Sequence, residues 1–186
     1  LLNQVKIGSA SKRWQSAFEL SKVFNNPDKI PTDISFKNQM VSSYNHAIHD
    51  DPLVRAYLAL AMGVTQDDFY ATVLVDGLND ENRESRLAAV QAVGMIATSA
   101  ASPKLKELVQ DSNFPQERLA STIALGLIGD EESIPLFLQF DQDHSPDGDF
   151  IHPLSLRQGG DGGLKGGMAE KGNGRLRSDS WLESYK

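Results

Sequence analysis

The sequence predicts an all-α protein in which antiparallel helix pairs stack into a solenoid. Three observations predict this fold. A helical segment recurs every 31 to 32 residues, an arginine stands at the same place in each copy, and a second amphipathic segment lies between copies. A helix pair of this length cannot bury its apolar face alone, so several pairs must stack to build a continuous core. We expect three to four pairs.

The recurring segment is ten residues long and aligns with itself without gaps. Its copies are VRAYLALAMG at 54–63, SRLAAVQAVG at 85–94 and ERLASTIALG at 117–126. A weaker copy, KRWQSAFEL, begins 42 residues before the first of these, with Arg13 in the arginine position. Alanine and leucine dominate the copies, and both are strong helix formers. Small residues three or four apart in each copy let a neighbouring helix approach closely.

Caps are predicted at both ends of these helices. Asp51-Pro52 supplies an N-cap acid followed by a proline at the first helical position. At the other end each copy closes near a glycine, at Gly63, at Gly94, and at Gly126 or Gly129. We expect these glycines to form left-handed C-caps.

The segments between the copies predict the remaining helices. Each carries apolar side chains at helical spacing and is bounded by prolines or polar turn residues. The expected helices cover residues 9–24, 33–48, 69–78, 103–109 and 133–140. Turns within the pairs are expected at 79–82 and 111–115.

Aspartates and arginines at a regular spacing carry a family resemblance. Val54-Arg55 follows Asp50-Asp51, Arg86 follows Asp80 by six residues, and Arg118 follows Asp111 by seven. The chain resembles HEAT-repeat proteins, of the short-repeat type that also occurs in phycobilisome-lyase-like sequences. The resemblance implies a structural ladder in which each arginine pairs with the aspartate of its own repeat. Its members would be Asp51, Arg55, Asp80, Arg86, Asp111 and Arg118.

The resemblance divides the chain into three parts. Residues 1–49 are expected to form an N-terminal helical repeat that opens the array, and residues 50–140 the HEAT-like repeats. Residues 141–186 are expected to be a linker and a disordered or aberrant tail, because residues 157–177 contain eight glycines. The next arginine-led helix is due near residue 150, where no such pattern stands. The array is therefore interrupted there, by natural disorder or by a frame change in the gene.

Charge narrows the range of partners. The net charge is −7, and residues 50–143 alone carry −10, whereas residues 1–49 carry +3. Phosphate backbones need a surface of the opposite sign, so no nucleic-acid partner is expected. A protein partner is expected, and a basic one is favoured. No run of 18 apolar residues exists, so no membrane span is predicted; both a cytoplasmic location and a tether through a missing N-terminal anchor stay open.

No catalytic, metal or cofactor site is predicted. Cysteine is absent, which removes thiol nucleophiles and zinc ribbons. Residues 143–149 resemble the first half of a calcium loop, but Leu154 stands where that loop needs a bidentate glutamate. His46 and His49 are three residues apart, without further ligands in a recognisable pattern. The glycines of the tail lack the order of a phosphate-binding loop.

The function implied by the resemblance is a non-catalytic scaffold for protein–protein interaction, with the partner held along the second helices of the pairs. One alternative is a lyase-like chromophore or maturation factor, which would need a reactive Cys or His in the groove. Another is a HEAT-like DNA-repair glycosylase, which would need a basic face with aromatic side chains. Fold alone does not decide among these functions.

Overall fold

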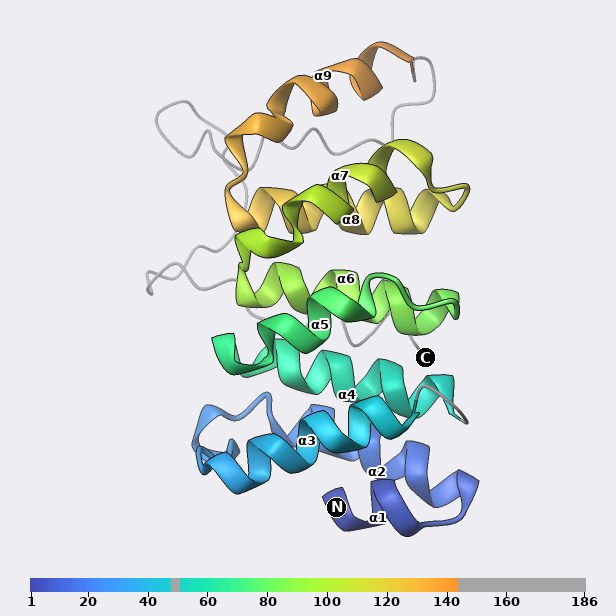
Figure 1. Cartoon of the computed structure of the whole chain (residues 1–186), viewed down its shortest axis with the longest axis vertical. Helices are drawn as coiled ribbons and strands as arrows, with labels where there is room; N and C mark the ends of the chain where they lie inside the picture. Colours follow the sequence, from blue (N-terminus) through green and yellow to red (C-terminus); the bar gives the residue numbers. More distant parts are fainter. Residues whose placement is uncertain (48–50, 144–186) are drawn as a thin grey trace, which may run out of the picture.

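The computed structural model describes residues 1–47 and 51–143, with side chains described as far as residue 138. Within these ranges the chain forms nine α-helices and no strand, which confirms the predicted all-α solenoid (Figure 1). The helices are α1 Leu2–Ile7, α2 Ala10–Val23, α3 Ile34–His46, α4 Pro52–Val64, α5 Ala71–Gly77, α6 Arg83–Ile96, α7 Ser102–Asp111, α8 Pro115–Ile128 and α9 Ile134–Asp143.

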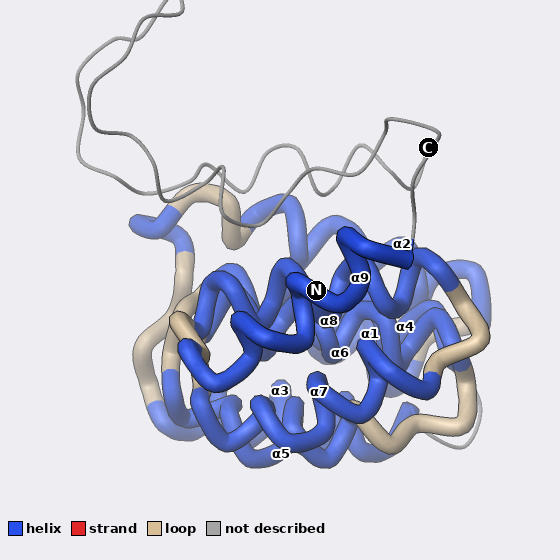
Figure 2. Tube along the Cα trace, turned by 90° about the horizontal axis from the view of Figure 1, so that it is seen from above, coloured by secondary structure: helices blue, strands red, loops and turns tan. Residues whose placement is uncertain are grey.

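The helices are arranged in two layers. Figure 2 shows α3, α5 and α7 along one side of the stack, and α2, α4, α6 and α8 along the other. Within the second layer each helix packs on the next, α2 on α4, α4 on α6 and α6 on α8. Each helix of the first layer also packs on the second-layer helix that follows it in the chain. Three pairs result, with α1 packed on α2 below them and α9 above them in Figure 1.

Polar side chains cap the helix starts. A carboxylate oxygen of Asp51 accepts a hydrogen bond from the Val54 amide at 3.2 Å, which confirms the predicted cap. The amide oxygen of Asn82 accepts from the Ser85 amide at 3.1 Å at the start of α6. Such caps satisfy amides that have no partner inside the helix. The short helix α1 was not predicted from the sequence, because its mixed residues show no clear helical period.

Short 3₁₀ turns mark the repeat as regularly as the arginines do. They cover Asp68–Tyr70, Ser99–Ala101 and Glu131–Ser133, and each leads directly into a first-layer helix. Their starts are 31 and 32 residues apart, the same period as the arginines. By this register α9 is the first-layer helix of a further repeat. Asp67 and Asp130 cap the first and last of these turns.

Large and small side chains alternate across the core. The first layer contributes bulky buried residues such as Tyr44, Leu74 and Leu105. The second layer contributes many buried alanines, which are Ala59, Ala61, Ala88, Ala89, Ala92, Ala120 and Ala124. Because alanine has almost no side chain, the second-layer helices approach closely and the bulky residues fill the space beside them.

Helices α4 and α6 end close to Gly63 and Gly94 as expected, but the prediction that these glycines form left-handed C-caps is wrong. Both lie inside their helices and face the next second-layer helix. A Cβ added at Gly63 would lie 2.7 Å from the Ala92 Cα, and one at Gly94 would lie 3.0 Å from the Ala124 Cα. Their role is close helix packing. The predicted left-handed cap is found at Gly129, with φ +76°, at the end of α8.

Part of the sequence interpretation falls outside the described structure. The glycine-rich tail lies wholly within residues 144–186, and the calcium-like loop and His49 also fall largely or wholly on residues outside the described ranges. In the described ranges no helix is both long and apolar enough to cross a membrane.

Alanine at the three aligned glycines will have opposite effects on stability. Gly63→Ala and Gly94→Ala will lower the free energy of unfolding by about 1–3 kcal/mol, because the new methyl meets the backbone of the neighbouring helix. Gly126→Ala will raise it by about 1 kcal/mol, because an added Cβ there has nothing within 4 Å and alanine favours the helix. Urea unfolding followed by circular dichroism measures all three, and equal effects would contradict the packing role.

Candidate functional site

Arg55 is buried at the boundary between two repeats, with 4% of its surface exposed. Its Nε donates to a carboxylate oxygen of Asp80, in the turn between α5 and α6. Its Nη1 donates to the carbonyl oxygen of Tyr44 at 2.9 Å, and the guanidinium carbon lies 3.9 Å from the centroid of the Tyr44 ring. The guanidinium on α4 therefore contacts both the turn before α6 and the end of α3. An ion pair on the exposed surface would not join three elements in this way.

Arg86 makes the equivalent contact one repeat later. Its Nε donates to Glu117 at 2.6 Å, and its Nη1 donates to the carbonyl oxygen of Asp80 at 2.6 Å. Glu117 is only 1% exposed, and its second carboxylate oxygen accepts a hydrogen bond from the Ser112 hydroxyl. Arg86 thus links α6 to the turn before it and to the helix after it.

Each of the two interfaces uses one acidic residue and one serine, but the acid and the serine stand in exchanged positions. Asp80 and Ser112 each stand six residues before an arginine, and Ser85 and Glu117 each stand one residue before it. Asp80 and Ser112 also make the same turn, because each accepts from the amide two residues on, at 2.9 and 3.2 Å. The carboxylate that neutralises the preceding arginine comes from the turn in one interface and from the helix in the next.

The ion pairs therefore differ from the predicted pairing within each repeat. Asp51 caps α4 instead of pairing with Arg55. Arg55 pairs with Asp80 of the following repeat. Asp111 is exposed at the end of α7, and no ion pair joins it to the half-buried Arg118 among the described residues. The reason is geometric. Each arginine lies on the side of its helix that faces the next repeat, so its buried partner must come from there.

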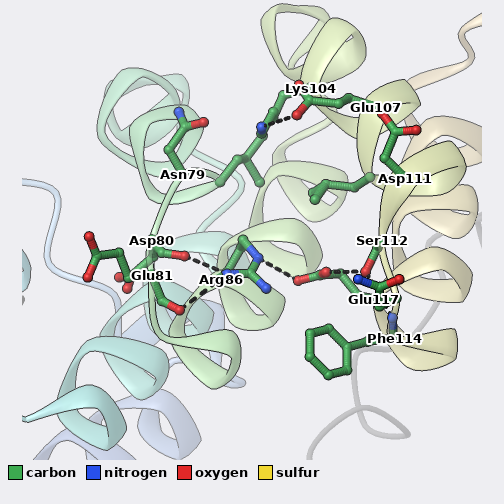
Figure 3. A pocket seen from close by; sticks show the side chains of 13 residues that line it. Asn79, Asp80, Glu81, Arg86, Lys104, Glu107, Asp111, Ser112, Phe114 and Glu117 are labelled. Carbon is green, nitrogen blue, oxygen red and sulfur yellow. Dashed lines mark hydrogen bonds and ion pairs between the residues drawn. The ribbon is translucent and has the colours of Figure 1, made fainter.

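A cleft of about 390 Å³ opens beside Arg86, at the edge of the stack formed by the turns between α5 and α6 and between α7 and α8 (Figure 3). The predicted partner groove was placed along the second-layer helices, whereas this cleft lies at their turns. It is lined by Leu78, Asn79, Asp80, Glu81, Arg86, Lys104, Glu107, Leu108, Asp111, Ser112, Asn113, Phe114 and Glu117.

The cleft is acidic. Five of its lining side chains are carboxylates and two are cationic, which leaves a formal charge of −3. Arg86 is neutralised by Glu117, and Lys104 pairs with Glu107 at 2.6 Å. Glu81 and Asp111 are exposed, and neither carboxylate makes an ion pair within the described part of the chain. They stand on opposite turns of the cleft, as Figure 3 shows. The arrangement suits a cation that reaches between the turns.

Comparison with known families agrees with the repeat register. The family model of HEAT repeats matches residues 45–125. Residues 45–125 are HEAT repeats. The matched residues run from the end of α3 through most of α8 and include both arginine interfaces. No curated protein matches the chain.

Further ion pairs join these HEAT repeats in the first layer. Lys37 on α3 pairs with Asp67 before α5, and this hydrogen bond holds the pKa of the Asp67 carboxyl below its usual range. Lys106 on α7 pairs with Asp130 before α9 at 3.0 Å. Burial acts to raise the pKa of Asp130, but hydrogen bonds from Lys106 and Ser133 outweigh it and lower that pKa. Both pairs lie nearer the surface than Arg55, so each stabilises the stack less.

No cluster of metal ligands is found in the described ranges. His46 is exposed in the last turn of α3. The sequence reasoning missed Glu117 as an ion-pair partner. The signal was available, because aligning the repeats on their arginines places Glu117 over Ser85 and Ser112 over Asp80.

The exchange of acid and serine between interfaces gives a test. Asp80→Ser leaves the buried Arg55 without its carboxylate and will lower the free energy of unfolding by about 3–5 kcal/mol. Adding Ser85→Glu reproduces the arrangement of Ser112 and Glu117, so the double variant will recover most of the loss. Ser85→Glu alone will destabilise, because it places a second carboxylate beside Asp80. A double-mutant cycle from denaturant unfolding measures the coupling, and additive effects would contradict the exchange.

Tyr44 makes the unfolding free energy depend on pH in the alkaline range. Burial raises the pKa of its phenol to about 12, and the nearby Arg55 offsets only part of that rise. The unfolded chain releases this proton near the ordinary value of 10.0, so the unfolding free energy will fall as the pH rises from about 10 to 12.

Tyr44→Phe removes this contribution and leaves the fold intact, since the Tyr44 hydroxyl has no hydrogen-bond partner in the described structure. The slope of stability against pH will become shallower in the variant, as measured by denaturant unfolding across that range. An unchanged slope would mean that Tyr44 does not ionise on unfolding.

Proposed function

We propose that this chain is a non-catalytic scaffold that binds a basic segment of a partner protein in the acidic cleft between the 78–82 and 111–114 turns. HEAT repeats are generally scaffolds for protein interaction, which supports the class of function. The observation that carries the proposal is the pair of unpaired, exposed carboxylates of Glu81 and Asp111 on facing sides of that cleft.

The chemistry of the lining favours a peptide over a small apolar ligand. Sites for small molecules are mostly apolar with a few polar groups. Here ten of the thirteen lining residues are polar or charged, and the three apolar ones are Leu78, Leu108 and Phe114. Phe114 is 40% exposed and already carries the guanidinium of Arg83 over its ring, at 4.4 Å from the centroid. A lysine or arginine stem packing on these apolar atoms places its charge between Glu81 and Asp111.

The cleft is also held rigid from behind. Arg86 ties the first turn to α8 through Glu117, and Ser112 ties the second turn to the same carboxylate. A preformed site loses little conformational freedom on binding. The acidic edge would also attract a basic partner at long range, with a rate that falls as salt rises.

The proposal is tested with a fluorescent peptide of alternating lysine and alanine, titrated with the full chain at low and physiological ionic strength. Glu81→Lys with Asp111→Lys will weaken binding about tenfold or more, since both cleft carboxylates become repulsive. The matched control is Asp68→Lys with Glu84→Lys, two exposed acids away from the cleft that give the same change in net charge. The control will keep most of the affinity.

Two outcomes would contradict the proposal. One is equal weakening in both double variants, which would mean that only net charge attracts the peptide. The other is no binding to the natural chain at low salt. Stability of each variant is measured alongside, so that loss of fold is not read as loss of the site.

A further inference from the structure

One contact recurs at two boundaries between second-layer helices, α4 with α6 and α6 with α8. Gly63 of α4 lies against Ala92 of α6, and Gly94 of α6 lies against Ala124 of α8. In both cases the glycine admits the backbone of the next helix at a distance that any side chain would block. The glycine therefore leaves a notch on the surface of one helix, and an alanine of the next helix packs into this notch.

An arginine accompanies each notch. Arg55 stands eight residues before Gly63, and Arg86 stands eight before Gly94, so each lies on the same side of its helix as the glycine. Both reach forward to a carboxylate of the following repeat. In the later boundary that carboxylate is Glu117, seven residues before the alanine of the notch. Helices α4 and α6 thus each offer a notch and a cation, and each receives an alanine from the next second-layer helix and an acid from the next repeat.

The forward side of α8 carries the same spacing of arginine and glycine, and two of its residues, Leu119 and Gly126, are exposed. Arg118 stands eight residues before Gly126, and Leu119 lies on the same side; we call these three residues the open face. A Cβ added at Gly126 meets no atom within 4 Å, and Leu119 is 44% exposed. The matching residues of α6, Leu87 and Gly94, are half-buried and buried. Helix α9 passes above α8 in Figure 1.

Thr122, one turn after Arg118, is buried, and its hydroxyl is satisfied within α8. It donates to the Arg118 carbonyl of its own helix at 2.9 Å, so it needs no outside partner. The repeat register gives α9 the first-layer place of the next repeat, and the second-layer place beside it is not filled by any described residue. The sequence due at that place, near residue 150, has neither the arginine-led pattern nor its alanines.

We propose that the open face of α8 binds an α-helix of a partner protein, one that carries a carboxylate seven residues before an alanine. The alanine enters the notch at Gly126, the carboxylate pairs with Arg118, and apolar side chains cover Leu119. The surface is separate from the acidic cleft and requires a partner of opposite character, since it takes an acidic helix rather than a basic segment.

A suitable probe is a fluorescent peptide with the sequence of Pro115–Ile128, held helical by a side-chain staple on its solvent face. This sequence contains the required Glu117 and Ala124 and already packs on the equivalent face of α6. The full natural chain will bind the probe saturably. Gly126→Leu and Leu119→Lys will each weaken binding about tenfold or more. Leu53→Lys is the matched control, with an equally exposed leucine at 43% on α4, and will leave binding unchanged.

The ionic contact is tested by a double-mutant cycle. Arg118→Gln will weaken binding of the natural probe but not of a probe carrying Glu117→Gln. Thermal melting of each variant checks the fold, and Gly126→Leu will melt no lower than the natural chain because its added atoms point into open space.

The proposal is overturned if the natural chain fails to bind the stapled probe, or if Gly126→Leu and Leu53→Lys behave alike. It stands or falls separately from the acidic cleft. Gly126→Leu will leave the lysine–alanine peptide bound as before, and the cleft variants will leave the stapled helix bound.

Discussion

The stack depends on an arginine at each of two boundaries, α4 with α6 and α6 with α8, and on a carboxylate of the next repeat that neutralises it. A buried guanidinium without a carboxylate costs several kcal/mol, so Arg55 is tolerated only while Asp80 stands beside it. The pair fixes more than charge. Asp80 also shapes the turn through the Asn82 amide, and Arg55 also holds the end of α3 through the Tyr44 carbonyl. Register, turn and packing are therefore coupled at a single point.

The same requirement explains why two different pairs of residues have equivalent roles at the two interfaces. These pairs are Asp80 with Ser85, and Ser112 with Glu117. What must be conserved physically is one negative charge within reach of the preceding arginine, together with one acceptor for the turn amide. A turn serine supplies the acceptor and a helix glutamate supplies the charge. Close helix packing is the second requirement, and it is met by glycine opposite alanine. Arginine, acid, glycine and alanine together define how one HEAT repeat of this chain recognises the next.

All these contacts run from one repeat to the next. The turn edge and the forward side of α8 therefore differ in chemistry. The turn edge accumulates carboxylates, because turns favour acidic caps and only some of those acids are used for ion pairs. The forward side of the last described second-layer helix keeps its cation and its notch, because the helix that would use them is not among the described residues. In the two proposals above, the acidic edge takes a basic segment and the end of the stack takes an acidic helix, so the two partners do not compete for one surface.

The sequence by itself determined the helical class, the 31- to 32-residue period and the position of each arginine, because helix propensity and spacing are local properties. It also located most helices to within a few residues. It missed α1 and assigned left-handed C-caps to Gly63 and Gly94. It also paired each arginine with the aspartate nearest in the chain. Only the tertiary structure decided these points. Whether a glycine caps a helix or admits a neighbour, and which carboxylate reaches a guanidinium, depends on what the next repeat places against that side of the helix. The number of residues between two positions does not say how far apart they lie in the folded stack.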